Sequence, residues 1–311
     1  MKTWKQLYAG LEDMSVKGGS DIGIVAAQAF LDYLKDHINS GSWYEEKVLE
    51  FGERIKTLKP SMGSVHNAID DLITIFKTYR NDAQRMLFVM DEYVSRYQQE
   101  TNQALNKIAE LFSSLIEDGD QLLTHSFTRS VLLAFDQALA LGKKFSVISA
   151  ESRPRNEGTY FASLLAGKGM DVTLITDAAV AHYIPKATKV LVGADALYTD
   201  GTVVNKMGTL NVAIIAHEFH KPVYVLTITT KLYLPSLFGK HLIMERRPVT
   251  EVLETEPDNP IVSSHLTVEN IFFEEIPPEY ITYLVTEKGL IKPCQLMNVA
   301  LPDRKEHCSA K

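Results

Sequence analysis

Cysteine is nearly absent from this chain of 311 residues, which contains only Cys294 and Cys308. Two cysteines near one end cannot build a disulfide framework, and neither belongs to a CxxC or Cys/His pattern of the kind that binds zinc. His217 and His220 are three positions apart, whereas a zinc-protease helix places its histidines four apart. We therefore predict a protein without structural disulfides and without a metal site.

Long apolar runs are missing as well. No segment reaches the roughly 18 apolar residues that a membrane-spanning helix needs, and the N-terminal sequence lacks the apolar core of a signal peptide. Neither a Walker A sequence nor a GxGxxG sequence occurs, so we expect no bound cofactor. Together these absences predict a soluble protein of the cytoplasm.

Positive charge is in deficit, because 32 Lys and Arg residues stand against 39 Asp and Glu residues, for a net charge of −7. A general nucleic-acid-binding protein needs a basic face that neutralises phosphates. The charge balance argues against such a function. It is still compatible with a local basic pocket that binds a small phosphate ligand.

Proline is scarce in the first part of the chain, where Pro60 is the only one before Pro154. Apolar residues recur there with helical spacing. The pattern predicts helices over Asp21–Leu34, Trp43–Leu58, Val65–Tyr79 and Asn81–Glu117. The stripe of Met86, Val89, Tyr93 and Tyr97 on the last of these is typical of a surface that packs against other helices. We predict a helical domain over residues 1–118.

The second part, residues 119–311, alternates between two kinds of segment. Short β-rich runs are Gln121–Thr124, Phe145–Ser149, Asp171–Ile175, Lys189–Val192, Val223–Thr227 and Ile281–Val285. Segments of helical length between them are Arg129–Ala140, Glu157–Lys168, Ala178–Tyr183 and Thr209–Phe219. Continuous apolar strands that alternate with helices indicate an α/β fold with a parallel sheet. Met244–Pro260 is expected to be an irregular insertion.

Polar residues follow the predicted strands, and in a parallel sheet these ends meet at one edge, where ligands bind. They are His125 and Ser126 after the first strand, Arg153 after the second, Asp177 after the third, Asp195 after the fourth and Lys231 after the fifth. The cationic groups could bind a phosphate, and the carboxylates could carry protons. The alternative is that these residues only serve the turns that follow each strand.

Two further segments could contribute to the same edge. Asp200-Gly201 predicts a hairpin turn, which would return Asn205 and Lys206 to this edge at the start of a helix, where an anion could bind. Lys17-Gly18-Gly19 precedes the first predicted helix, and its glycines permit a close approach of the backbone to a ligand. Each could equally be an ordinary loop.

Several ordered blocks of the chain resemble one family. They are EDGDQLLTHSFTRSV, AESRPRNEG, VTLITDAAVAHYI, VLVGADALYTDGTVVNKMGT and YLVTEKGLIKP. The chain resembles ribose-1,5-bisphosphate isomerase, methylthioribose-1-phosphate isomerase and the regulatory alpha, beta and delta subunits of eukaryotic translation initiation factor 2B. This resemblance implies an N-terminal helical domain followed by a Rossmann-like domain.

The resemblance also implies an activity. The enzymes of the family interconvert a phosphorylated aldose and a ketose, with a cysteine and an aspartate as the acid–base pair. The aspartate corresponds to Asp195 in the GAD sequence, whereas the cysteine position carries Ser126. A hydroxyl is much less acidic than a thiol, so His125 or Ser126 would have to take over the role of the thiol.

The ligand positions that the resemblance implies are Lys17, Gly18, Gly19, Arg153, Asn205 and Lys206, to which the strand-end argument adds Lys231. The implied ligand is a phosphorylated pentose, and the implied assembly is a homodimer or homohexamer. Ser126 also admits a second hypothesis, a non-catalytic regulatory subunit that associates with other initiation factor 2B subunits. A third is an isomerase of another phosphorylated sugar.

Overall fold

The N-terminal part of the chain is helical in the computed structural model, which describes residues 2–39, 45–253 and 265–300. Its helices are α1 (Trp4–Glu12), α2 (Gly19–Asn39), α3 (Glu45–Leu58), α4 (Gly63–Tyr79) and α5 (Ala83–Ser114). Helix α1 was not predicted. It begins with a capping box, in which Thr3 and Gln6 exchange hydrogen bonds between side chain and backbone. Trp43, the predicted start of α3, lies outside the described residues.

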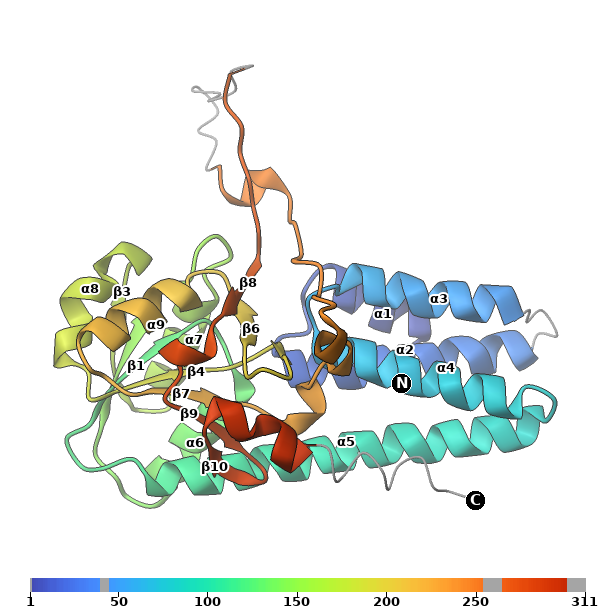
Figure 1. Ribbon diagram of the computed structural model, residues 1–311, viewed down its shortest axis with the longest axis horizontal. Helices are drawn as coiled ribbons and strands as arrows, with labels where there is room; N and C mark the ends of the chain where they lie inside the picture. The colour runs from blue at the N-terminus through green and yellow to red at the C-terminus, as the bar shows by residue number, and fades with distance from the viewer. Residues whose placement is uncertain (1, 40–44, 254–264, 301–311) are drawn as a thin grey trace.

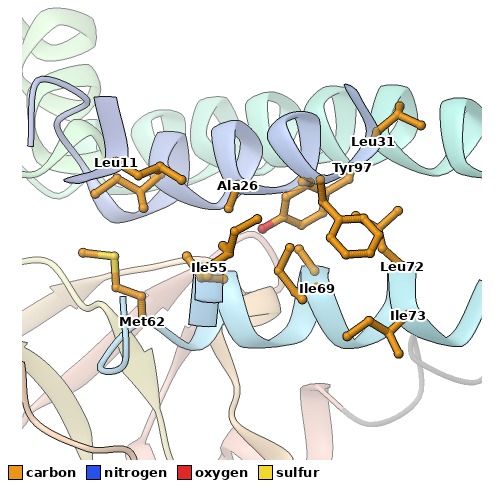
Figure 2. Packing of buried hydrophobic residues seen from close by; sticks show 14 of the residues in the cluster. Leu11, Ala26, Leu31, Ile55, Met62, Ile69, Leu72, Ile73 and Tyr97 are labelled. Atoms are coloured by element: carbon orange, nitrogen blue, oxygen red, sulfur yellow. The ribbon is translucent and has the colours of Figure 1, made fainter. Parts of the chain in front are cut away.

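The core of this helical body lies between α2, α4 and α5. Figure 2 shows Ala26 of α2 pointing toward Ile69 of α4, with the ring of Tyr97 beside them. Met86 and Tyr97 of the predicted stripe are buried in this cluster, and Tyr93 packs against its edge. The prediction that this stripe packs against other helices is therefore confirmed for these three residues, whereas Val89 does not belong to the cluster.

A sheet of seven strands forms the centre of the second body. Its strands are β1 (Gln121–His125), β2 (Ser146–Ala150), β3 (Asp171–Ile175), β4 (Lys189–Val192), β7 (Val223–Leu226), β9 (Tyr283–Thr286) and β10 (Gly289–Ile291). The strand order is β10-β9-β7-β4-β1-β2-β3, and every neighbouring pair is parallel except β9 and β10. The predicted α/β class and parallel sheet are confirmed, whereas the antiparallel edge strand β10 was not predicted.

Helices cover both faces of this sheet (Figure 1). Helices α5, α6 (Arg129–Ala140) and α7 (Glu157–Gly167) cover one face, and α8 (Val180–Tyr183) and α9 (Thr209–Glu218) cover the other. Successive strand residues point to opposite faces, so Leu122 is buried on the first face and Leu123 on the second. This double coverage explains why the strands read as continuous apolar runs. None of the helices that the structure describes is long and apolar enough to cross a membrane.

A second, small sheet joins the two bodies. Strands β5 (Ala196–Leu197) and β6 (Val203–Lys206) form the predicted hairpin, and β8 (Phe273–Ile276) pairs with β6 in antiparallel register. Phe272 and Phe273 belong to the core of the helical body, although they lie far from it in the sequence. The hairpin places Asn205 and Lys206 on β6, at the boundary between the two bodies.

Candidate active site at the carboxyl edge of the sheet

A cavity opens where the strand order of the large sheet reverses. The chain runs from β1 through β2 to β3 on one side and then crosses to β4 on the other side of β1. Such a switch point is where α/β sheets bind ligands. Ser126 follows β1, and Gly193, Ala194 and Asp195 follow β4, and all four line the cavity. Its empty volume is about 760 Å³, with the open space at its mouth included.

Most of the candidate residues from the sequence meet at this cavity. Lys17, Gly18, Gly19, Ser126, Asp195, Asn205, Lys206 and Lys231 all line it. Arg155 and Glu157 also line it, at the start of α7. Four cationic side chains therefore face two carboxylates. This excess of positive charge suits a phosphate-bearing ligand.

Asp195 lies deep in the cavity, between the two bodies of the protein. Its N–H donates to Val204 O (2.7 Å), and its own carbonyl accepts from Gly63 N–H of α4 (3.0 Å). These two bonds fix the backbone of the residue. Burial raises the pKa of its carboxyl to about 6, although the ammonium of Lys231 acts in the opposite direction. A carboxyl with this pKa can accept and return a proton near neutral pH.

Lys231 is buried beside Asp195 at the end of a short 3-10 turn, Thr229–Lys231. Its Nζ donates to Ala194 O at 2.6 Å. Burial lowers the pKa of this ammonium, and the charge of Asp195 opposes that shift. The side chain is thus held by the protein itself, next to the candidate base.

Gly19, the first residue of α2, closes over this pair. A Cβ atom at this position would lie 2.5 Å from Asp195 Oδ1 and 3.3 Å from Lys231 Nζ. Real Cβ atoms do not show contacts as short as 2.5 Å, so any larger residue here would force the Asp195 carboxylate to move. Lys17 lies just before it, with its Nζ 3.5 Å from the centre of the Tyr160 ring, a cation–π contact with α7.

Lys206 is paired with a carboxylate inside the cavity. Its Nζ lies 3.0 Å from Glu157 Oε2 and 3.9 Å from the centre of the Phe272 ring. Burial lowers the pKa of this ammonium, while Glu157 opposes that shift. Glu157 therefore compensates part of the positive charge that an anionic ligand would meet.

Three of the candidate residues, His125, Arg153 and Asp177, do not line the cavity. His125 is the last residue of β1 and is buried, and its Nδ1 contacts Thr209 Oγ1 at 3.2 Å. The Arg153 guanidinium donates to Val252 O at 3.3 Å, while its backbone N–H donates to Asp177 Oδ2 at 2.7 Å. The arginine that lines the cavity is Arg155, two residues further along the chain.

Ser126 lies directly after β1 in a left-handed backbone conformation, with φ of 65°. Its N–H donates to Ser152 Oγ at 2.7 Å, and Ser152 has a similar φ of 63°. Non-glycine residues in this region are uncommon and often mark functional sites. Asp177 accepts from the Ser152 N–H at 2.8 Å, in addition to its bond with Arg153, so its carboxylate holds this loop.

The N-terminus of α9, which the sequence suggested as an anion site, is occupied by the protein's own carboxylate. Glu274 Oε1 accepts from the backbone N–H of Gly208 (2.6 Å) and of Leu210 (3.0 Å). These amides are therefore not available to a ligand. Neighbouring Asn205 and Lys206 still line the cavity.

One wall of the cavity is apolar, and its residues belong to the core of the helical body or pack against it. It consists of Met14, Val16, Ile22, Met62, Phe272 and Phe273. Sequence reasoning missed this wall, because its residues come from three distant segments and read as ordinary core positions. Phe127 and Thr128, which follow Ser126, also line the cavity and were not predicted.

No group of three or more His, Cys, Asp or Glu side chains that could hold a metal ion occurs in the described part of the chain. The cavity instead offers a carboxyl that can exchange a proton near neutral pH, a hydroxyl and several fixed cations. This set suits proton transfer within a small phosphorylated molecule.

The chain matches one protein family, several curated proteins and several solved structures. The Initiation factor 2 subunit family matches residues 15–293 of the chain. The chain belongs to this family. It is 31% identical to ribose 1,5-bisphosphate isomerase of Methanocaldococcus jannaschii over 291 residues, which cover 93% of the chain and 91% of the relative.

Other relatives of the chain carry a different name. The chain is 31% identical to a putative translation initiation factor eIF-2B subunit 2-like protein of Pyrococcus furiosus, over 91% of the chain and 95% of the relative. Among solved structures, the translation initiation factor eIF-2B of Pyrococcus horikoshii matches with a TM-score of 0.77 and 26% identity, over 95% of the chain and 98% of that protein.

Proposed function

We propose that this protein is a sugar-phosphate aldose–ketose isomerase that acts on a ribose-1-phosphate-type ligand of the ribose 1,5-bisphosphate class. The observation that carries the proposal is the position of Asp195. Its carboxyl, with a pKa of about 6, faces a cavity at the switch point of the sheet, among an excess of cationic groups. The name of the Methanocaldococcus jannaschii relative supports the same reading.

The reaction requires the sugar ring to open before a hydrogen moves between C2 and C1. Asp195 is the proposed general base, since it faces the cavity and ionises near neutral pH. Lys17, Arg155 and Lys206 are the proposed phosphate ligands. Ser126 lines the same cavity and takes the place of a catalytic cysteine, whereas His125 lies outside the lining.

The test is incubation of the purified protein with ribose 1,5-bisphosphate and with methylthioribose 1-phosphate, with ketose formation followed by NMR. Asp195→Asn is expected to lower the rate by about 10²–10⁴-fold. Asp200→Asn is the matched control, because this carboxylate accepts a backbone bond in the hairpin turn and asparagine can replace it. No ketose from either substrate would refute the isomerase proposal for those two sugars.

A second proposed function is that of a non-catalytic regulatory subunit of a translation-factor complex. Ser126 favours it, because a hydroxyl is a poor substitute for a catalytic thiol. The name of the Pyrococcus furiosus relative is consistent with it. A pull-down from native lysate separates the two proposals: copurification with other subunits of the family supports the regulatory role, and a homo-oligomer alone argues against it.

We further propose that the chain assembles into a homodimer or homohexamer and does not bind nucleic acid directly. Light scattering of the purified protein measures the first property. The net charge of −7 supports the second. Binding to labelled RNA at physiological salt would contradict it.

A further inference from the structure

The hydroxyl of Thr209 is the centre of a buried hydrogen-bond cluster next to the cavity. Thr209 is the first residue of α9, and its Oγ1 lies 2.6 Å from Lys206 O, 3.0 Å from Asn205 Nδ2 and 3.2 Å from His125 Nδ1. All four residues are at most 5% exposed. The cluster thus connects the end of β1, strand β6 and the start of α9.

The position of each proton in this cluster follows from its chemistry. A carbonyl oxygen cannot donate, so the 2.6 Å contact between Thr209 Oγ1 and Lys206 O requires the single hydroxyl proton to lie between them. The hydroxyl oxygen then acts only as an acceptor toward its other two neighbours. Asn205 must offer its amide nitrogen, and His125 must offer a protonated Nδ1.

The orientation of the Thr209 hydroxyl also determines the protonation state of the second ring nitrogen of His125. Burial lowers the pKa of the ring to about 4, so the ring is neutral at neutral pH and carries one proton. With that proton on Nδ1, Nε2 is unprotonated and can only accept a hydrogen bond. Nε2 is buried without a hydrogen-bond partner and lies against the backbone of Gly208, where a Cβ would be 2.9 Å away. Gly208 also has a φ of 100°, a backbone conformation that favours glycine. Both this φ and the short contact with Nε2 therefore disfavour a side chain at position 208.

The Thr209 hydroxyl also determines which atom of the Asn205 amide is left for a ligand. Its Nδ2 is directed to Thr209, and no donor among the described residues reaches its Oδ1. Since Asn205 lines the cavity, this oxygen is left for a ligand. A carbonyl oxygen accepts a hydrogen bond from a sugar hydroxyl, but a phosphate dianion has no proton to give it.

We propose that His125 and Thr209 are positioning residues, which lock the Asn205 amide so that its Oδ1 selects a hydroxyl of the ligand and not its phosphate. The part of this inference that concerns the ligand rests on the proposed sugar-phosphate function. The part that concerns His125 does not, because it follows from the cluster alone. His125 accordingly holds its proton toward Thr209 and does not deliver one to the ligand.

The first experiment measures the tautomer of His125 in the full-length protein labelled with ¹⁵N-histidine, with the resonance assigned by its loss in His125→Asn. The expected result is a neutral ring protonated on Nδ1 that does not titrate between pH 6 and pH 8. A ring protonated on Nε2, or one that titrates in this range, would overturn the proposal. The measurement needs no ligand, so it stands even if the isomerase proposal fails.

The second experiment uses paired variants and two probes, ribose 1-phosphate and inorganic phosphate, with binding measured by calorimetry. Asparagine places its amide nitrogen near the position of Nδ1, and glutamine places it near Nε2. His125→Asn and Thr209→Ser should therefore keep the affinity for ribose 1-phosphate. His125→Gln and Thr209→Val should weaken it about tenfold, because one oriented hydrogen bond is lost.

Inorganic phosphate discriminates between a positioning role and a merely structural one. Its affinity should change less than about twofold in all four variants, because Asn205 does not bind the phosphate in this scheme. An equal loss for both probes, or unchanged binding of ribose 1-phosphate in Thr209→Val, would contradict the assigned role of Asn205. If the wild-type protein binds inorganic phosphate but not ribose 1-phosphate, the proposed function is wrong. The tautomer measurement still tests the proton position on His125 in that case.

Discussion

The pairing of Lys231 with Asp195 allows a quantitative prediction for Lys231→Met. Methionine keeps most of the buried volume and removes the charge. A Cβ on Gly19 would lie 2.5 Å from Asp195 Oδ1 and 3.3 Å from Lys231 Nζ, so the two charged atoms are less than about 6 Å apart. At that distance and an effective dielectric constant near 20, their attraction is roughly 3 kcal/mol, which corresponds to about two pH units of ionisation.

The sign of the effect follows from the role of Asp195 as a base. With its pKa of about 6, Asp195 is about nine-tenths ionised at pH 7. Loss of the neighbouring ammonium destabilises the carboxylate, so the ionised fraction at pH 7 falls to roughly one-tenth. We expect kcat/KM of Lys231→Met to be about tenfold lower at pH 7 and to recover above about pH 9, since the acidic limb of the profile moves upward.

The assay is a pH profile of kcat/KM with the sugar phosphate that proves to be the substrate. Lys107→Met, an exposed lysine on α5, is the control and should leave the profile unchanged. Thermal unfolding accompanies the assay, because Ala194 O loses its donor, at a cost of about 1–3 kcal/mol. A loss of activity that is equal at every pH would refute this reasoning and would assign Lys231 to phosphate binding instead.

Three further predictions concern single positions. Gly19→Ala should lower activity at least 10²-fold in steady-state kinetics, because its Cβ would lie 2.5 Å from a carboxylate oxygen. Gly167→Ala is the control at a helical glycine where a Cβ would meet nothing within 4 Å. It should raise the free energy of unfolding by about 0.5–1 kcal/mol in urea. Ser126→Cys should raise kcat by about 10²-fold at pH 8 and add a titrating limb to the pH profile of kcat. If the kinetics of Ser126→Cys are identical to those of Ser126→Ala, position 126 transfers no proton. Lys59→Met should destabilise the fold by about 1–3 kcal/mol, because it removes one of the two cations that pair with the buried Glu245 and leaves Arg247, 3.1 Å away, as the other. Lys35→Met breaks a half-exposed ion pair and should cost less than about 1 kcal/mol in the same denaturant titration.

The carboxyl edge of the sheet was predictable because it depends on periodicity. Strand and helix alternation placed Asp195 and Lys231 at one edge, and the Asp200-Gly201 turn returned Asn205 and Lys206 to it. These inferences need only the local pattern of the chain and the handedness of its crossovers.

The features that the sequence did not reveal depend on side-chain orientation and on contacts between distant segments. Arg153 and Arg155 lie in the same loop, but only Arg155 lines the cavity, whereas the guanidinium of Arg153 donates to Val252 O. Glu274 caps α9 from a strand more than sixty residues away along the chain. His125 reads as a candidate acid, and only its contact with Thr209 reveals where its proton lies. No single-sequence pattern encodes these partners.

Helix α5 has 32 residues, which at 1.5 Å per residue makes a rod of about 48 Å. Its first half contributes Met86 and Tyr97 to the helical core, and its second half contributes Leu105 and Phe112 to the core under the sheet. The two bodies therefore share helix α5, and neither has a complete core without it. A cut after residue 118, where the sequence suggests a boundary between domains, would remove α5 from one face of the sheet, which α6 and α7 would then cover only in part. The two bodies should consequently unfold together, in a single transition.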